Sequence, residues 1–95
     1  MRILFAAHEN SWGGFFGLIR AELPGHEFVA TGRFGLDTLQ GFDVLIPTMC
    51  PVSRETLETA DRLKLIQQCG AGLEGVDIAA AHDRNIWVAN VPTDL

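Results

Sequence analysis

The chain has 95 residues, the length of one domain, and its 47% hydrophobic and 20% charged residues are ordinary for a globular protein and exclude general disorder. Seven basic and twelve acidic residues give a net charge of −5, which argues against a nucleic-acid partner because phosphates would repel an acidic surface. No apolar run approaches the roughly 20 residues of a membrane span, and the apolar start is too short for a signal peptide. With only two cysteines and no C-x-x-C motif, the sequence predicts a cytoplasmic protein with reduced thiols.

The first half of the chain alternates between strand and helix patterns. Residues 2–7 form an apolar run typical of a strand buried on both faces. Apolar residues then recur at helical spacing over 12–23, where Pro24 and Gly25 end the helix. A second strand is expected at 27–31, followed by one short helical turn at 36–40.

The second half continues the alternation, with two helices between three further strands. These elements are expected at residues 44–47, 54–62, 65–68, 78–84 and 86–91. Ser53 and Asp77 are good N-caps for the two helices, and Asn85 can take the left-handed conformation that closes the second one.

Alternating strands and helices with short links indicate an α/β domain with a parallel sheet and helices on both faces. Five strands suit the flavodoxin-like order 2-1-3-4-5, and residues 1–95 are expected to form this single domain. In such folds the ligand crevice lies outside the carboxyl ends of the strands. Those ends are residues 8–10, 48–50, 70–72 and 90–92, so a binding site is expected among them.

Residues 70–75 follow a predicted strand and match the dinucleotide pattern G-x-G-x-x-G. Three features count against a nucleotide site. The helix cap Asp77 comes after the third glycine, the crossover is shorter than the roughly 30 residues of a βαβ unit, and the neutral Asn90 stands where a ribose-binding acid is expected. Two other interpretations are open: glycines that permit a tight turn, and a loop whose backbone N–H groups receive a small anion.

His8, Cys50 and Cys69 would lie at the ends of three neighbouring strands. A zinc ion could use such side chains, but the short ligand pairs typical of structural zinc sites are missing. Small buried thiols and a loop histidine are the preferred interpretation, and no Ser-His-Asp arrangement can be placed from the strand ends. We therefore predict no metal-binding and no catalytic residue in this chain.

A series of short motifs lies between residues 63 and 92. They are Leu63-Lys64-Leu65-Ile66, Gly70-Ala71-Gly72, Val76-Asp77, Ala79-Ala80-Ala81, Arg84-Asn85-Ile86 and Asn90-Val91-Pro92. Together they resemble the amino-terminal, substrate-binding domain of D-isomer-specific 2-hydroxyacid dehydrogenases. Residues 43–53 are similar to that family more weakly, and residues before about position 42 add only a compatible strand–helix–strand pattern.

The resemblance implies that backbone amides of Ala71 and Gly72 hold the carboxylate of a small 2-hydroxy or 2-oxo acid, with Gly70 and Cys50 as further substrate-binding candidates. The family's catalytic arginine, glutamate and histidine, and its Rossmann domain for NAD or NADP, would follow Leu95, as would a segment that returns to complete the substrate domain. The chain is then a fragment of an oxidoreductase that is inactive and binds no cofactor alone, and it can self-associate through surface that the missing segments would cover. The alternative is a stand-alone flavodoxin-like binding module without catalysis.

Overall fold

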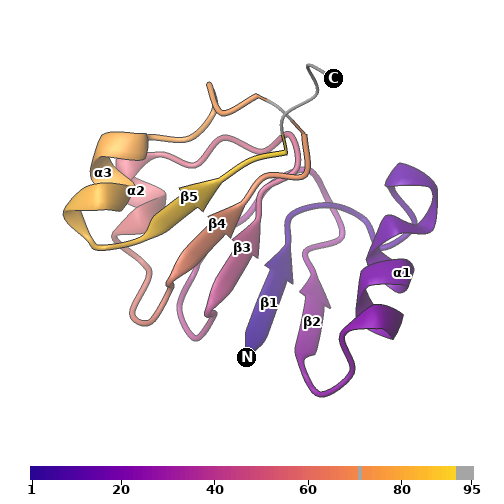
Figure 1. Ribbon diagram of the computed structural model, residues 1–95. Coiled ribbons are helices and arrows are strands. Elements are labelled where there is room, and N and C mark those ends of the chain that lie inside the picture. Colours follow the sequence, from indigo (N-terminus) through magenta and orange to yellow (C-terminus); the bar gives the residue numbers. More distant parts are fainter. Residues whose placement is uncertain (71, 92–95) are drawn as a thin grey trace.

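A computed structural model of the chain describes residues 1–70 and 72–91 (Figure 1). Within these residues, five parallel strands form one sheet in the order β2-β1-β3-β4-β5. The strands are β1 (Arg2–Phe5), β2 (Glu27–Ala30), β3 (Val44–Ile46), β4 (Leu65–Gln67) and β5 (Trp87–Ala89). The predicted α/β class and the predicted strand order are confirmed.

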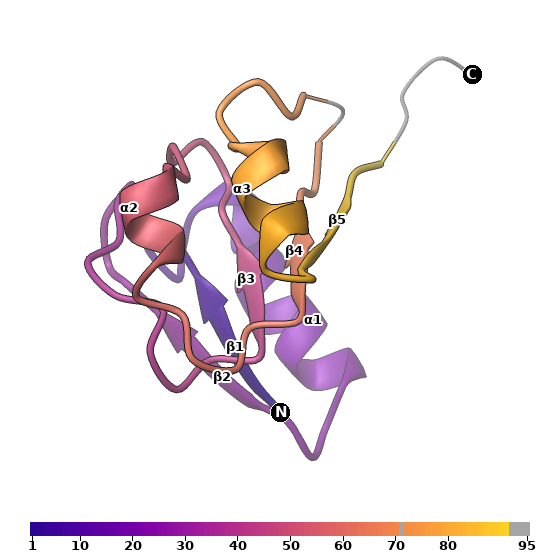
Figure 2. The same cartoon turned by 90° about the vertical axis from the view of Figure 1, so that its left-hand side faces the viewer.

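Helices lie on both faces of the sheet, as expected. They are α1 (Phe15–Glu22) with the preceding 3-10 turn η1 (Trp12–Gly14), α2 (Arg54–Leu57) and α3 (Ile78–Asp83). Figure 2 shows the sheet turned towards its edge, with α1 on one side and α2 and α3 on the other. No helix in the described part of the chain is long and apolar enough to cross a membrane.

Alternating side chains of β1 build two separate cores. Leu4 faces α2 and α3 and belongs to a cluster with Leu45, Leu57 and Ile66. Phe5 points to the opposite face, where its ring lies 5.3 Å from that of Phe16 in α1, measured between centroids. Aromatic packing of this kind holds α1 on β1 and β2 although its glycine content disfavours helix formation.

The first helix begins later than the apolar spacing predicts. Trp12, Gly13 and Gly14 take positive φ angles of 61°, 63° and 87°, so the regular helix starts only at Phe15. Positive φ is easy for glycine and uncommon for tryptophan. The left-handed turn places Trp12 at the carboxyl end of the sheet, close to Phe15 with 6.1 Å between the ring centroids.

The helix expected at 54–62 is shorter in the structure and ends at Leu57. Glu58 N–H still donates to the Arg54 carbonyl, but the next bonds reach only three positions back, from Thr59 N–H to the Thr56 carbonyl and from Ala60 N–H to the Leu57 carbonyl. The Thr59 hydroxyl also donates to the Thr56 carbonyl at 2.6 Å. A threonine that bonds the local backbone in this way competes with helix continuation.

The helical turn expected at 36–40 is absent from the structure, where this segment is irregular. Two of its backbone donors are satisfied by side chains. Leu39 N–H donates to the Thr59 hydroxyl at 2.8 Å, and Gln40 N–H donates to the Thr38 hydroxyl at 3.1 Å. The segment therefore needs no helical hydrogen bonds to bury Leu39 completely.

Candidate functional site

A cleft of about 340 Å³ lies at the carboxyl ends of the strands, where the fold class predicts a ligand crevice. Its lining is Trp12, Thr48, Met49, Cys50, Gln68, Gly70, Gly72, Glu74, Gly75 and Val76. The structure thus brings three of the four predicted substrate-binding residues, Cys50, Gly70 and Gly72, to one cleft. The fourth, Ala71, lies outside the described residues.

The glycine loop offers backbone N–H groups to solvent. Within the described residues, neither Gly70 nor Gly72 donates its N–H to another group, while the Gly70 carbonyl accepts from Val91 N–H at 3.1 Å. Neither glycine has a positive φ, so the turn does not require glycine for its backbone conformation. The absent side chains instead leave the amides open to a small ligand, which favours an anion-receiving loop over a purely structural turn.

The loop lacks the geometry of a dinucleotide fingerprint. In that fingerprint a helix begins at the glycines and directs its amino end at the pyrophosphate. Here α3 begins only at Ile78, and the carboxylate of Asp77 accepts from Ala80 N–H at 3.0 Å. The amino end of α3 is therefore already capped by a negative charge, and the described loop does not direct a free helix end at the glycines as the fingerprint does.

A short parallel bridge fixes the glycine loop against the loop that follows β3. Val52 N–H donates to the Gly75 carbonyl at 2.8 Å, and Asp77 N–H donates to the Val52 carbonyl at 2.9 Å. The bridge holds the loop that carries Cys50, which forms one wall of the cleft, next to the glycine loop, which forms the other wall. Sequence analysis missed this pairing because an isolated bridge between two loops has no periodic pattern.

Two buried polar side chains tie the strand ends together beneath the cleft: Thr48, which lies in the range 48–50 expected at the site, and Gln68, which sequence analysis missed. The Thr48 hydroxyl donates to the Ala6 carbonyl at 2.8 Å, and the Gln68 side-chain amide donates to the Thr48 carbonyl at 2.8 Å. Gln68 also accepts from Cys69 N–H at 3.0 Å. Thr48 has a φ of 56°, a left-handed conformation that is rare for a β-branched residue and occurs most often at functional sites.

The thiols and the loop histidine have ordinary structural surroundings. Burial raises the pKa of the Cys50 thiol, whose Sγ donates to the Pro51 carbonyl at 3.4 Å, and burial likewise raises the pKa of Cys69. Both are therefore neutral thiols at pH 7. His8 is exposed, and its Nδ1 accepts from Asn10 N–H at 3.1 Å. Over residues 1–70 and 72–91, no three potential metal ligands come together.

The charge at the cleft is negative. Glu74 lines it, and its carboxylate lies so close to Gly72 that a Cβ added to that glycine would be 2.5 Å from Oε2. No lysine, arginine or histidine belongs to the described lining. An anion in this cleft would interact with backbone dipoles but with no positively charged side chain of the described lining. The Glu74 carboxylate would repel the anion weakly.

The parallel sheet in the order 2-1-3-4-5, with a cleft at its carboxyl ends, defines a flavodoxin-like α/β domain. The model of the family described as D-isomer specific 2-hydroxyacid dehydrogenase, catalytic domain, matches residues 28–95. The chain belongs to this family, as the motifs between residues 63 and 92 predict.

Individual relatives agree with this assignment. The chain is 35% identical over 75 residues to D-3-phosphoglycerate dehydrogenase from Methanocaldococcus jannaschii. This aligned region covers 75% of the chain and 14% of that protein. It is 36% identical over 58 residues to glyoxylate reductase from Thermococcus litoralis. This aligned region covers 60% of the chain and 18% of that protein. NAD-dependent formate dehydrogenase from Staphylococcus aureus, solved with NAD, superposes with a TM-score of 0.75 and 30% identity over 97% of the chain and 31% of its own length. The chain therefore spans about a third or less of the length of these relatives.

Proposed function

We propose that this chain is the substrate-binding part of an NAD- or NADP-dependent D-2-hydroxyacid dehydrogenase and that its cleft receives the carboxylate of a small 2-hydroxy or 2-oxo acid. The observation that carries the proposal is the open glycine loop after β4, whose Gly70 and Gly72 amides donate to no other described group. Backbone amides grouped in this way bind small anions. The family and the names of its members, glyoxylate reductase among them, support a small 2-oxo acid as the ligand.

The chain alone is expected to be inactive. Oxidation of a 2-hydroxy acid needs a group that takes the hydroxyl proton and a cofactor that takes the hydride. The described cleft lining holds no histidine or arginine, and Asp77 closes the helix end where a dinucleotide would bind. In our proposal the residues that complete the reaction, and the NAD(P) site, belong to a further domain of an intact enzyme.

In our proposal the protein acts in the cytoplasm. Cys50 and Cys69 are free thiols, which supports a reducing compartment.

The proposal that this chain binds the acid, while a further domain supplies the cofactor site and the catalytic residues, can be tested on the purified 95-residue chain. With NADH and glyoxylate, we expect no loss of NADH absorbance, and NADH fluorescence should show no binding in the micromolar range. Glyoxylate itself should bind at millimolar concentration or more weakly, no better than about −4 kcal/mol, since neither a cation nor a closing domain assists. Turnover by the pure chain or micromolar NADH binding would contradict the proposal.

A further inference from the structure

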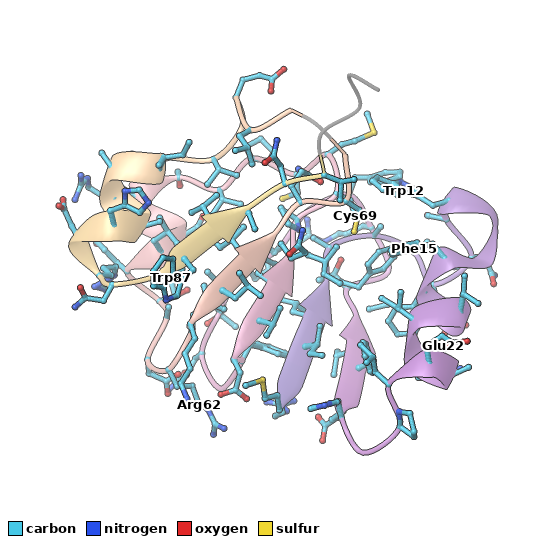
Figure 3. The ribbon with its side chains drawn as sticks, in the orientation of Figure 1. Trp12, Phe15, Glu22, Arg62, Cys69 and Trp87 are labelled. Carbon is cyan, nitrogen blue, oxygen red and sulfur yellow. The ribbon has the colours of Figure 1, made fainter. Side chains whose placement is uncertain are left out.

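Trp12 is held at the cleft by an unusual turn. Its φ of 61° is left-handed, as are those of Gly13 and Gly14, so that three such residues precede α1. This conformation is unfavourable for a tryptophan, and residues held in it are found most often at functional sites. Contact with the Phe15 ring, 6.1 Å away between centroids, helps to fix the indole. Figure 3 shows the Trp12 side chain extending from this turn towards the carboxyl ends of the strands.

The cleft has an apolar part beside its glycine loop. Trp12 and Met49 contribute the large apolar side chains of the lining, and they are 39% and 76% exposed. Cys50 and Val76, which are buried, complete this part. Single exposed apolar residues are common on protein surfaces, but two large ones that line one cleft offer apolar surface to a ligand.

The cleft is larger than the simplest 2-oxo acid requires. Its volume of about 340 Å³ is in the range of roughly 300–1,000 Å³ that is typical of pockets for drug-sized ligands. An acid whose carboxylate lies at the Gly70 and Gly72 amides fills only the part next to the glycine loop if, like glyoxylate, it has a hydrogen as its side chain. The space lined by Trp12 and Met49 then remains for a larger side chain on the 2-oxo carbon.

The charge of the lining disfavours a second anionic group on the ligand. Glu74 is the one charged side chain of the described lining, it is exposed, and no described basic side chain pairs with it. Arg33 does not line the cleft, and its guanidinium is bound to the Asp37 carboxylate at 2.6 Å. A ligand with a second carboxylate or a phosphate would therefore contact no cation of the described lining and would be repelled by Glu74.

We propose that Trp12 and Met49 are specificity-determining residues and that the cleft selects 2-hydroxy or 2-oxo acids with an uncharged, apolar side chain. This inference rests on the proposed function, because the glycine loop must hold the carboxylate that both kinds of acid share. The indole of Trp12 is a large and rigid contact surface, so little conformational entropy is lost when a ligand covers it. Glu74 adds the discrimination against acids with a second negative charge.

Two acids of similar size test the side-chain preference. The side chain of 4-methyl-2-oxopentanoate ends in two methyl groups, whereas that of 2-oxoglutarate ends in a carboxylate. We expect the 95-residue chain to bind 4-methyl-2-oxopentanoate at least about fivefold more tightly than glyoxylate and about tenfold more tightly than 2-oxoglutarate, because it alone buries apolar surface without a second charge. Titration of the 15N-labelled chain, read at the Gly70 and Gly72 amides, gives the three dissociation constants. The indole N–H of Trp12 should shift with 4-methyl-2-oxopentanoate, and that of Trp87 should not.

Trp12→Gly tests the role of the indole. Glycine adopts a φ of 61° easily, so the turn should persist. The ratio of the dissociation constants of glyoxylate and 4-methyl-2-oxopentanoate should fall from at least about five to about one. Trp87→Phe is the matched control and should retain the ratio, because Trp87 is 77% exposed and does not line the cleft.

Glu74→Gln is a second variant, at an exposed side chain whose replacement should not disturb the fold. It should narrow the difference between 4-methyl-2-oxopentanoate and 2-oxoglutarate by about threefold at low ionic strength, since it removes the repulsion of the second carboxylate. The ratio of the two constants is the quantity to compare, because any effect on the shared carboxylate cancels in it.

The outcomes for this inference and for the proposed function are distinguishable. Glyoxylate has no side chain to contact Trp12, so its shifts at the Gly70 and Gly72 amides report the carboxylate site alone. If glyoxylate shifts these amides but 2-oxoglutarate binds as tightly as 4-methyl-2-oxopentanoate, the inference is overturned and the proposed function stands. The same holds if folded Trp12→Gly retains the preference. If none of the three acids shifts these amides, both are wrong.

Discussion

Asp43 shows how one side chain organises the amino end of the sheet. It is buried at the start of β3, and its carboxylate accepts from Arg2 N–H at 2.8 Å. Arg62 donates to the same carboxylate through Nε at 3.0 Å and Nη2 at 3.1 Å. The Arg2 N–H bond, followed by the Arg62 pair, lowers the pKa of Asp43 below its ordinary value. One residue thereby joins β1 and β3 to the segment that leads into β4.

The lowered pKa of Asp43 predicts a loss of stability in acid. A carboxyl group whose pKa is lower in the folded state contributes stability above its unfolded pKa of about 3.9 and loses it as the pH falls through the folded pKa. The free energy of unfolding should therefore fall below about pH 4, and less steeply in Asp43→Asn, which should also be less stable at pH 7. Urea unfolding followed by circular dichroism from pH 7 to pH 2.5 measures both effects.

Asp37→Asn is the matched control, because Asp37 pairs with Arg33 on the surface, where ion pairs contribute little. Identical pH slopes for Asp43→Asn and the wild-type chain would show that Asp43 is not the group responsible.

Sequence reasoning could place cleft residues that directly follow a strand, but it could not predict the long-range hydrogen bonds beneath the cleft. Gly70, Gly72 and Cys50 could be placed because each follows a recognisable strand, and the carboxyl ends of parallel strands meet at one edge. Thr48 and Gln68 act through long-range hydrogen bonds, to Ala6 and between each other, whose partners are far apart along the chain. For Thr48 the available signal was a polar residue directly after an apolar run, whereas Gln68 follows another glutamine and lacks even that signal.

At the scale of elements, helix boundaries marked by a local capping residue were predicted, whereas the start of α1 and the end of α2 were not. The Ser53 side chain accepts from Thr56 N–H at 3.3 Å and Asp77 caps α3, as predicted, and Asn85 has the left-handed φ of 59° expected after a helix. Caps are set by neighbours within a few residues. The early end of α2 depends on Thr59, which also binds Leu39 N–H from a distant segment.

The cap of α3 gives a prediction at this scale. Asp77→Ala should lower the free energy of unfolding by about 1 kcal/mol, because Ala80 N–H loses its acceptor at the helix start. Asp77→Asn retains a side-chain oxygen in the same place and should remain close to the wild-type chain. Urea denaturation at pH 7 compares the three proteins, and equal loss in both variants would rule out the capping bond as the cause.

For the whole molecule, the sequence predicted the sheet order because short right-handed crossovers leave few arrangements of five strands. It could not predict where the sheet is bare, since Leu65 and Trp87 have the residue types of any core strand. The Val52–Val76 bridge, which fixes the cleft, could not be predicted either, because it joins two loops through backbone atoms alone. Exposure of a sheet face and pairing between loops are properties of the assembled fold rather than of a local pattern.

The central claim is that the glycine loop after β4 is the anion site of the domain. The most direct measurement is a titration of the 15N-labelled chain with glyoxylate, read at backbone amides. We predict saturable shifts at Gly70, Gly72 and Leu73 with a millimolar midpoint, and their loss in Gly72→Val. Because Gly72 is exposed and has no positive φ, this variant should fold normally while its side chain blocks the approach to the amides. The claim is contradicted if those amides stay still while others shift, or if folded Gly72→Val binds glyoxylate as the wild-type chain does.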